Sequence, residues 1–316
     1  MFWRKPRPFE ASTSTSALTA PTLADLMALA GAAGQLRGWQ VRAEARQRGD
    51  YRAPIRGRGM EYAESRPYQA GDDVRALDWR LTARLGKPHT KLFREERERP
   101  VCLGVDLGPS SHFATRGVFK RVQAARTAAL LAWKASLEGD RVGGVIGQSA
   151  RHEVLVPGRG NPAVVQCLKA LSRMGGLALP ELGTAVSLQG LLRALSALCR
   201  PGGLVFLLTD GRGLDEGAWD LVAEIRRRCQ LSLIIIRDPL EIGLPPISAP
   251  LRICDPQGGA ARTLLSPAGA TAYAAHQATA LAALEQRARE QRCSLTLLTT
   301  DGSPLDAVQA LLRRPR

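Results

Sequence analysis

Four oxygen-bearing side chains lie where the sequence predicts loops at the carboxyl ends of strands. Asp106 ends the apolar run VCLGVDL and is followed by Ser110, whereas Asp210 ends the run LVFLLTD. Thr184 lies between these strands, at the predicted start of a helix. Carboxylate and hydroxyl oxygens are hard ligands, which suit Mg²⁺ or Mn²⁺ with several retained waters. Together the four residues predict a metal site at one rim of the fold.

Each of these residues also has an ordinary structural explanation. Threonine is a good helix N-cap, so Thr184 is also explained as the cap of the helix it precedes. Asp210–Gly211 is a common turn dipeptide. The metal prediction therefore depends on the four side chains lying together and not on any one of them.

The elements that must position these side chains alternate regularly after residue 100. Apolar runs predict strands at 101–107, 141–148, 152–157, 203–210, 231–237 and 294–300, and the second and third of these form a hairpin. Helical periodicity predicts helices at 119–138, 162–173, 215–228, 269–292 and 305–313, one starting at 184, and an edge hairpin around 257–259. This order predicts an α/β fold with a doubly wound, mostly parallel sheet. In such sheets ligands bind at the carboxyl ends of the strands.

Composition limits the compartment and the class of partner. The 316 residues carry a net charge of +15, which favours an acidic partner surface, anionic lipid or nucleic acid. The six cysteines are far apart in sequence, with no C-x-x-C pair, which is typical of a reduced protein. Because no long apolar run or leader pattern is present, we expect a cytoplasmic protein without a membrane span.

The chain before Pro100 has a different character. Residues 1–16 are expected to form a flexible arm, and residues 22–47 show helical periodicity that Gly31 and Gly34 interrupt. Residues 49–99 are rich in Arg, Asp and Gly and are expected to be irregular. The predicted organisation is therefore an arm (1–16), an N-terminal segment (17–99) and an α/β domain (100–316).

Charged and aromatic side chains alternate within a short part of the N-terminal segment. Arginine pairs with carboxylates in bidentate fashion and stacks on aromatic rings. An internal lattice of ion pairs is the first interpretation, a docking surface for a partner the second and nucleic-acid binding the third. The residues concerned are Arg66, Tyr68, Asp72, Asp73, Arg75, Asp78, Trp79, Arg80 and Arg84.

The metal-site pattern resembles the metal-ion-dependent adhesion site of von Willebrand factor A (vWA) domains. In that pattern, Asp-x-Ser-x-Ser follows the first strand, and a later Thr and Asp complete the site. Asp106, Ser110, Thr184 and Asp210 match, but Gly108 replaces the middle hydroxyl. The resemblance implies that the site binds a Mg²⁺ ion (or Mn²⁺ or Ca²⁺), with an affinity weakened by Gly108. It also implies that a carboxylate of a partner protein completes the coordination of the ion.

A second resemblance covers residues 50–150 closely and the remainder more loosely. The segment RPYQAGDDVRALDWRLTAR (66–84), with GMEY (59–62) before it and FREE (93–96) after it, is similar to the bacterial family named domain of unknown function 58. Tyr62 and Leu77 stand where that family has Phe and Ile. The resemblance implies a vWA-like protein that works with a MoxR-type AAA+ ATPase and other vWA proteins.

The leading functional prediction is therefore a non-enzymatic adaptor in the assembly or maturation of other proteins. A metal-dependent, phosphatase-like hydrolase that uses the strand-end carboxylates is an alternative, although no Asp-x-Asp follows the first strand. Binding of nucleic acid is a third alternative, motivated by net charge alone. Acidic residues interleaved with the arginines of segment 66–84 count against it.

Overall fold

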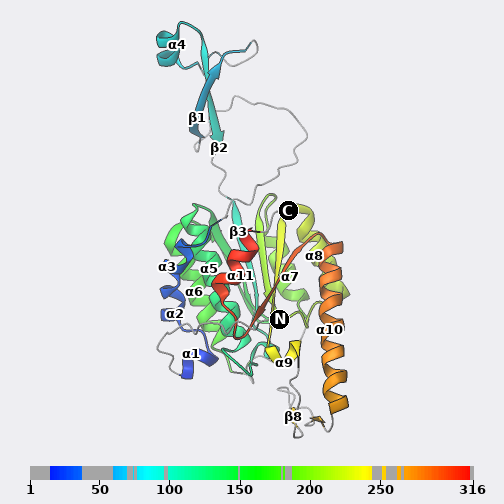
Figure 1. Cartoon of the computed structure of the whole chain (residues 1–316). Coiled ribbons are helices and arrows are strands. Elements are labelled where there is room, and N and C mark those ends of the chain that lie inside the picture. Colours follow the sequence, from blue (N-terminus) through cyan, green and yellow to red (C-terminus); the bar gives the residue numbers. More distant parts are fainter. Residues whose placement is uncertain are drawn as a thin grey trace, which may run out of the picture. The chain divides into compact units, whose positions relative to one another are not determined.

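The computed structural model describes most of the chain in two compact units, shown in Figure 1. The described residues are 15–37, 60–69, 74, 77–95, 99–148, 150–178, 181, 187–243, 251–253, 262–264 and 267–313. One unit contains residues 1–43 and 99–316, and the other contains residues 44–98. Four residues singled out from the sequence, Thr184, Asp72, Asp73 and Arg75, lie outside the described residues, as does the predicted arm up to residue 14.

The larger unit contains a six-stranded sheet with the order β10-β7-β6-β3-β4-β5. Five neighbouring strands, from β10 to β4, are parallel, and the edge strand β5 pairs with β4 in antiparallel orientation. The strand order reverses between β3 and β6, as expected of a doubly wound sheet. The predicted fold class is therefore confirmed. The strands are β3 (Pro100–Asp106), β4 (Arg141–Gly147), β5 (His152–Gly158), β6 (Leu204–Thr209), β7 (Gln230–Arg237) and β10 (Ser294–Thr299).

Helices cover both faces of this sheet (Figure 1). One apolar core joins the sheet to α5 (Lys120–Leu137), α6 (Gly160–Gly175) and α11 (Pro304–Arg313). A second core joins the other face to α7 (Gln189–Leu198), α8 (Glu216–Arg228) and the last turns of α10 (Pro267–Glu290). Successive residues of β3 alternate between the cores: Leu103 belongs to the first and Cys102 to the second. Both faces are covered, which explains why the central strands are continuous apolar runs.

Close packing on the second face depends on a glycine in β3. A β-carbon at Gly104 would lie 2.8 Å from a methyl carbon of Leu195 on α7 and 3.0 Å from one of Leu207 on β6. Glycine therefore allows α7 to approach the strand that carries Asp106 at its end.

Three short helices near the N-terminus belong to the larger unit. They are α1 (Thr15–Thr19), α2 (Leu23–Ala28), which the Thr22 hydroxyl caps, and α3 (Ala30–Gly34). Leu26 is fully buried in the first core, and the Trp133 ring nitrogen donates a hydrogen bond to the Leu26 carbonyl. These contacts divide the chain differently from the predicted 17–99 segment, because residues 15–37 pack on α5 and α6.

The smaller unit is built on an antiparallel pair of strands, where the sequence suggested an irregular segment. Strands β1 (Met60–Pro67) and β2 (His89–Glu95) pair along their lengths, and α4 (Trp79–Leu85) lies between them in sequence. Their charged residues hide the usual apolar alternation, so the pairing has no clear sequence signal. In the larger unit, the predicted hairpin forms between β8 (Leu251–Ile253) and β9 (Arg262–Leu264), but as a separate two-stranded sheet and not at an edge of the main sheet.

None of the helices in the described ranges is both long enough and apolar enough to span a lipid bilayer.

Candidate functional site

The candidate site lies at the carboxyl ends of β3 and β6, where the strand order reverses. These two strands are neighbours, and Val105 pairs with Leu208 one or two residues before the strand-end carboxylates Asp106 and Asp210. The helices that follow the two strands, α5 and α8, cover opposite faces of the sheet. Doubly wound proteins bind their ligands at such a position, where the connections after two neighbouring strands diverge.

Asp106 is held by hydrogen bonds to both of its carboxylate oxygens. The Gly108 backbone N–H donates to Oδ1 at 3.0 Å, and the Thr209 hydroxyl donates to Oδ2 at 2.8 Å. Burial, followed by the negative charge of Asp210, raises the pKa of Asp106 from 3.8 to about 7. The predicted pair Asp106 and Asp210 is therefore brought together closely enough for each charge to act on the other.

A buried lysine, which sequence reasoning missed, lies beside this pair. The Lys120 side chain is 2% exposed, and its Nζ lies 2.6 Å from Glu241 Oε1 and 3.5 Å from Asp210 Oδ2. The ammonium also lies 5.6 Å from the centre of the Phe113 ring, within range of a cation–π contact. Lys120 is the first residue of α5, directly after the loop that Asp106 opens. That position was the only signal available in the sequence.

Glu241 reaches the site from α9 (Pro239–Ile242), a short helix after β7. Asp238 caps α9, and the Glu241 carboxylate accepts a hydrogen bond from the Asp238 backbone N–H at 2.9 Å, which completes a capping box. Asp238 also accepts hydrogen bonds from Thr115 and from the Thr300 hydroxyl. Burial acts to raise the pKa of Asp238, but these hydrogen bonds outweigh it and hold the pKa below its usual value. Asp238 therefore connects the start of α9 to the loops that contain Thr115 and Thr300.

Arg212 supplies the exposed part of this charge cluster. Its side chain is 48% exposed, and Nη2 lies 3.1 Å from Glu241 Oε1 while Nε lies 3.7 Å from Asp210 Oδ2. Its backbone N–H donates to Asp210 Oδ1 at 3.0 Å. We call Asp106, Asp210, Glu241, Lys120 and Arg212 the strand-end cluster. Arg212 is the most exposed member of the cluster, and Asp106 is also partly exposed.

His112, in the loop after Asp106, makes a structural contact with Arg121. Arg121 Nη1 donates to His112 Nε2 at 2.9 Å and to the Leu177 carbonyl at 2.8 Å, and its Nε donates to the Thr19 carbonyl. Burial and then the charge of Arg121 lower the pKa of His112 to about 4. The ring is therefore neutral at pH 7 and accepts a hydrogen bond that helps to hold the loop.

The residues present fit a divalent cation poorly. The Lys120 ammonium already lies beside Asp210, and Gly108 supplies a backbone N–H where the adhesion-site pattern has a hydroxyl. Ser110 is half-buried in the 3₁₀ turn η2 (Pro109–Ser111), while the neighbouring Ser111 hydroxyl donates to the Gly108 carbonyl. Within the described residues, no three His, Cys, Asp or Glu side chains are grouped as a metal ion requires.

The predicted signature residues of the smaller unit have mixed roles. Asp78 caps α4 by accepting from the Leu81 N–H, and it also accepts from the Ser65 hydroxyl at 3.0 Å. Tyr68 is half-buried, and its backbone N–H donates a hydrogen bond to the Pro88 carbonyl. Arg66 Nη1 donates to the carbonyl of Pro67. By contrast, Trp79 is 68% exposed and Arg84 is exposed in the last turn of α4. A docking role remains a prediction for Trp79 and Arg84.

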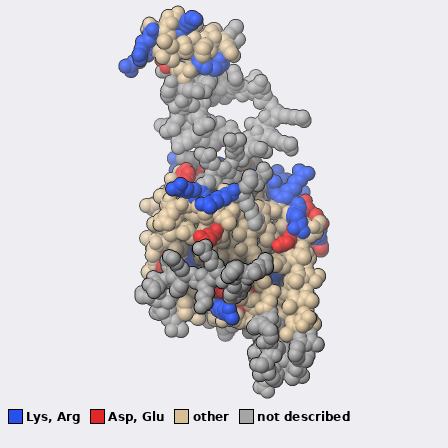
Figure 2. All heavy atoms as spheres, in the orientation of Figure 1, with Lys and Arg blue, Asp and Glu red and all other residues tan. Residues whose placement is uncertain are grey.

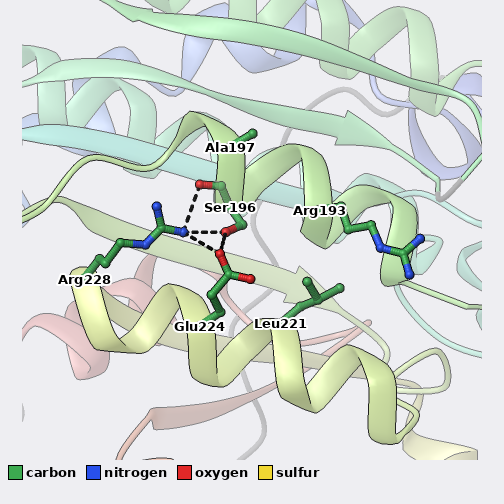
Figure 3. Close-up of a pocket in the computed structure, with 6 residues that line it drawn as sticks. All are labelled: Arg193, Ser196, Ala197, Leu221, Glu224 and Arg228. Atoms are coloured by element: carbon green, nitrogen blue, oxygen red, sulfur yellow. Dashed lines mark hydrogen bonds and ion pairs between the residues drawn. The ribbon is translucent and has the colours of Figure 1, made fainter.

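A shallow hollow between α7 and α8 is a weaker candidate site (Figure 3). It encloses about 230 Å³ and is lined by Arg193, Ser196, Ala197, Leu221, Glu224 and Arg228. Arg228 and the Ser196 hydroxyl both bond to Glu224, at 2.9 and 2.7 Å. These polar groups satisfy one another and brace the two helices.

Comparison with known proteins places the chain in a family. A family model described as "Protein of unknown function DUF58" matches residues 64–291. Uncharacterized proteins of Mycobacterium bovis and Mycobacterium tuberculosis are each 32% identical over 238 residues, which cover 73% of this chain and 73% of theirs.

Similar solved structures include conserved hypothetical protein BatB from Bacteroides thetaiotaomicron. It is 16% identical, with a TM-score of 0.40, over 67% of this chain and 96% of its own. Another is a von Willebrand factor type A protein from Catenulispora acidiphila, 10% identical with a TM-score of 0.38, over 71% of this chain and 44% of its own. From the family match and the mycobacterial relatives, we conclude that this chain belongs to the DUF58 family of proteins of unknown function.

Proposed function

We propose that this protein is a non-enzymatic adaptor that binds a partner protein at the strand-end cluster. The partner proposed is a MoxR-type AAA+ ATPase, acting in the assembly or maturation of other proteins. The observation that carries the proposal is the position of Arg212, which is half-exposed beside the carboxyl ends of β3 and β6, where the strand order reverses. Proteins with this type of sheet bind their ligands at such strand ends.

The hydrogen bonds around the carboxylates favour an adaptor over an enzyme. Both oxygens of Asp106 accept hydrogen bonds, and Glu241 accepts from Lys120, Arg212 and the Asp238 backbone. These carboxylates hold loops in place, which is the arrangement expected of a preorganised docking surface. Preorganisation lowers the entropy that a partner must overcome on binding.

The charge of the exposed groups indicates what the partner presents. Arg212 is a planar guanidinium, which suits bidentate contact with a carboxylate. On the face of the larger unit shown in Figure 2, the described Lys and Arg side chains form separate groups, and several have Asp or Glu beside them. Such mixed charge favours an acidic side chain of a protein over the continuous phosphate backbone of nucleic acid.

The test is a binding titration between the purified protein and a MoxR-type ATPase from the same organism. Arg212→Glu reverses the exposed charge, so we expect its Kd to rise about tenfold or more, as for other charge reversals at interfaces. Arg289→Glu is the matched control, because Arg289 is an exposed arginine at the other end of the sheet, in the last turn of α10 before β10. Its Kd should remain close to that of the wild type.

Two results would contradict the proposal. The first is the absence of any complex between the wild-type protein and the ATPase at micromolar concentrations. The second is an equal Kd for wild type and folded Arg212→Glu, which would place the interface elsewhere on the protein.

A further inference from the structure

We infer that Lys120 is the resident cation of the strand-end cluster and that this site takes no divalent metal ion. The inference goes beyond the adaptor proposal, because it concerns the isolated protein and does not depend on a partner. It also differs from the expectation of Mg²⁺ that the adhesion-site resemblance implied.

The position of the ammonium carries the inference. Lys120 Nζ lies between two carboxylates from different loops, 2.6 Å from Glu241 and 3.5 Å from Asp210. The side chains of all three residues are at most 3% exposed. Charges buried to this degree persist in proteins only when an opposite charge neutralises them. Lys120 therefore performs the neutralising role that a metal ion would have beside Asp106 and Asp210.

A metal ion and Lys120 would compete for the same carboxylate. A cation bound to Asp106 and Asp210 would lie within a few ångströms of the ammonium, about the distance at which like charges repel strongly in a protein interior. Asp210 Oδ2 faces both Lys120 and Arg212, while Oδ1 accepts the Arg212 backbone N–H. The negative charge of Asp210 is therefore already neutralised by groups of the protein itself.

Lys120 is also held so that it cannot easily leave. Its backbone N–H donates to the Phe113 carbonyl, and the ring of Phe113 lies against its ammonium. The next residues of α5 are fixed by Arg121, which bonds to Thr19 and Leu177, and by Gln123, which bonds to Thr299 and Gly302. Withdrawing the charge into solvent would require the start of α5 to move.

The experiment compares metal binding by the wild type, Lys120→Met and Lys134→Met. Lys134 is a second buried lysine of α5, whose partner Glu138 is partly exposed, so its replacement leaves no buried group of carboxylates. Each protein is titrated with MnCl₂ by calorimetry. Its melting temperature is then measured in EDTA and in about 10 mM MgCl₂, because an ion that binds the native state raises Tm.

We expect no saturable Mn²⁺ binding and an unchanged melting temperature for the wild type and for Lys134→Met. Lys120→Met should melt at a lower temperature in EDTA and recover part of that loss in MgCl₂, because the metal would replace the missing charge. The recovery should disappear in Lys120→Met combined with Asp106→Asn.

Saturable Mn²⁺ binding by the wild type that Asp106→Asn abolishes would overturn the inference. The inference would also be overturned if a folded Lys120→Met protein bound no Mn²⁺ and had the same Tm in MgCl₂ as in EDTA. The ammonium would then not occupy a position that a cation can take. If Lys120→Met does not fold, the Mn²⁺ titration of the wild-type protein tests the inference by itself. None of these readouts involves the ATPase, so they remain separate from the test of the adaptor proposal.

Discussion

The strand-end cluster brings three carboxylates together with two cations, of which Lys120 is buried and Arg212 is half-exposed. Lys120 and Arg212 lie close to Asp210 and Glu241, whereas Asp106 receives hydrogen bonds from Gly108 and Thr209 instead of an ion pair. Asp106 is therefore the member whose charge is least compensated. Burial and then the charge of Asp210 therefore raise its pKa to about 7, although the charge of Lys120 acts in the opposite direction.

Replacing Asp106 by Asn should stabilise the protein in a pH-dependent way. Because folding raises the pKa of Asp106 from 3.8 to about 7, the folded state binds this proton more tightly, and the resulting stability is lost as pH rises through that window. Asp106→Asn stays neutral, so we expect it to exceed the wild type by about 1–3 kcal/mol above pH 7 and to match it near pH 4. Urea denaturation across this pH range measures the difference.

Asp215 is a control of opposite sign for that experiment. It caps α8, and the hydrogen bond from the Ala218 backbone N–H lowers its pKa. Asp215→Asn should therefore be less stable than the wild type at neutral pH, with a difference that shrinks in acid. Destabilisation by Asp106→Asn at pH 8 would show that the charged carboxylate is favourable and that the pKa of Asp106 is not raised.

At the scale of elements, the first turn of α5 connects the strand-end loops. Lys120 reaches α9, Arg121 reaches the N-terminal helices and the loop after α6, and Gln123 reaches the end of β10. Each contact joins positions at least 56 residues apart. One helix start therefore holds together the loops after several strands, and the rim keeps a fixed shape.

Gln123→Leu should weaken this arrangement measurably. Gln123 is 1% exposed, and its Nε2 donates to the carbonyls of Thr299 at 2.7 Å and Gly302 at 2.8 Å. The substitution leaves two acceptors without this donor, which should cost about 1–3 kcal/mol in the free energy of unfolding.

Thr127→Val is the matched control, measured beside it by thermal or urea denaturation. Thr127 is equally buried on the same helix, but its hydroxyl donates only to the carbonyl of Gln123 within α5. Its effect should be smaller. Equal losses for the two variants would mean that the link from α5 to β10 adds nothing beyond burial.

At the scale of the molecule, the N-terminal helices complete the larger unit. Helices α2 and α3 cover α5 and α6, and the Arg37 backbone exchanges two hydrogen bonds with the Gln309 side chain near the other end of the chain. The described part of the chain before residue 38 therefore packs as part of the larger unit.

Leu26→Ala should destabilise the whole larger unit in a single transition. Leu26 is fully buried, and removing a buried leucine side chain costs about 2–5 kcal/mol. Met27, the next residue, is 41% exposed, so Met27→Ala should cost well under about 1 kcal/mol. Urea unfolding followed by tryptophan fluorescence measures both. An early, separate transition in Leu26→Ala would show that these helices unfold independently.

The sequence by itself determined the main strands and most of the helices of the sheet, although α9 was not predicted and α7 begins at Gln189 and not at residue 184. Helix and strand periodicity are local properties, so the strands that end at Asp106 and Asp210 and the helix α5 lie close to their predicted positions. The general rule for doubly wound sheets then put both carboxylates at one rim.

Only the tertiary structure decided what surrounds those carboxylates. Lys120 and Glu241 are 121 residues apart, and nothing local distinguishes a buried charged pair from two solvated residues. Pairing of β1 with β2 was missed for a related reason, since backbone hydrogen bonds between charged strands leave no apolar pattern. Burial and pairing of charges depend on contacts between distant parts of the chain, so they become visible only when the chain is folded.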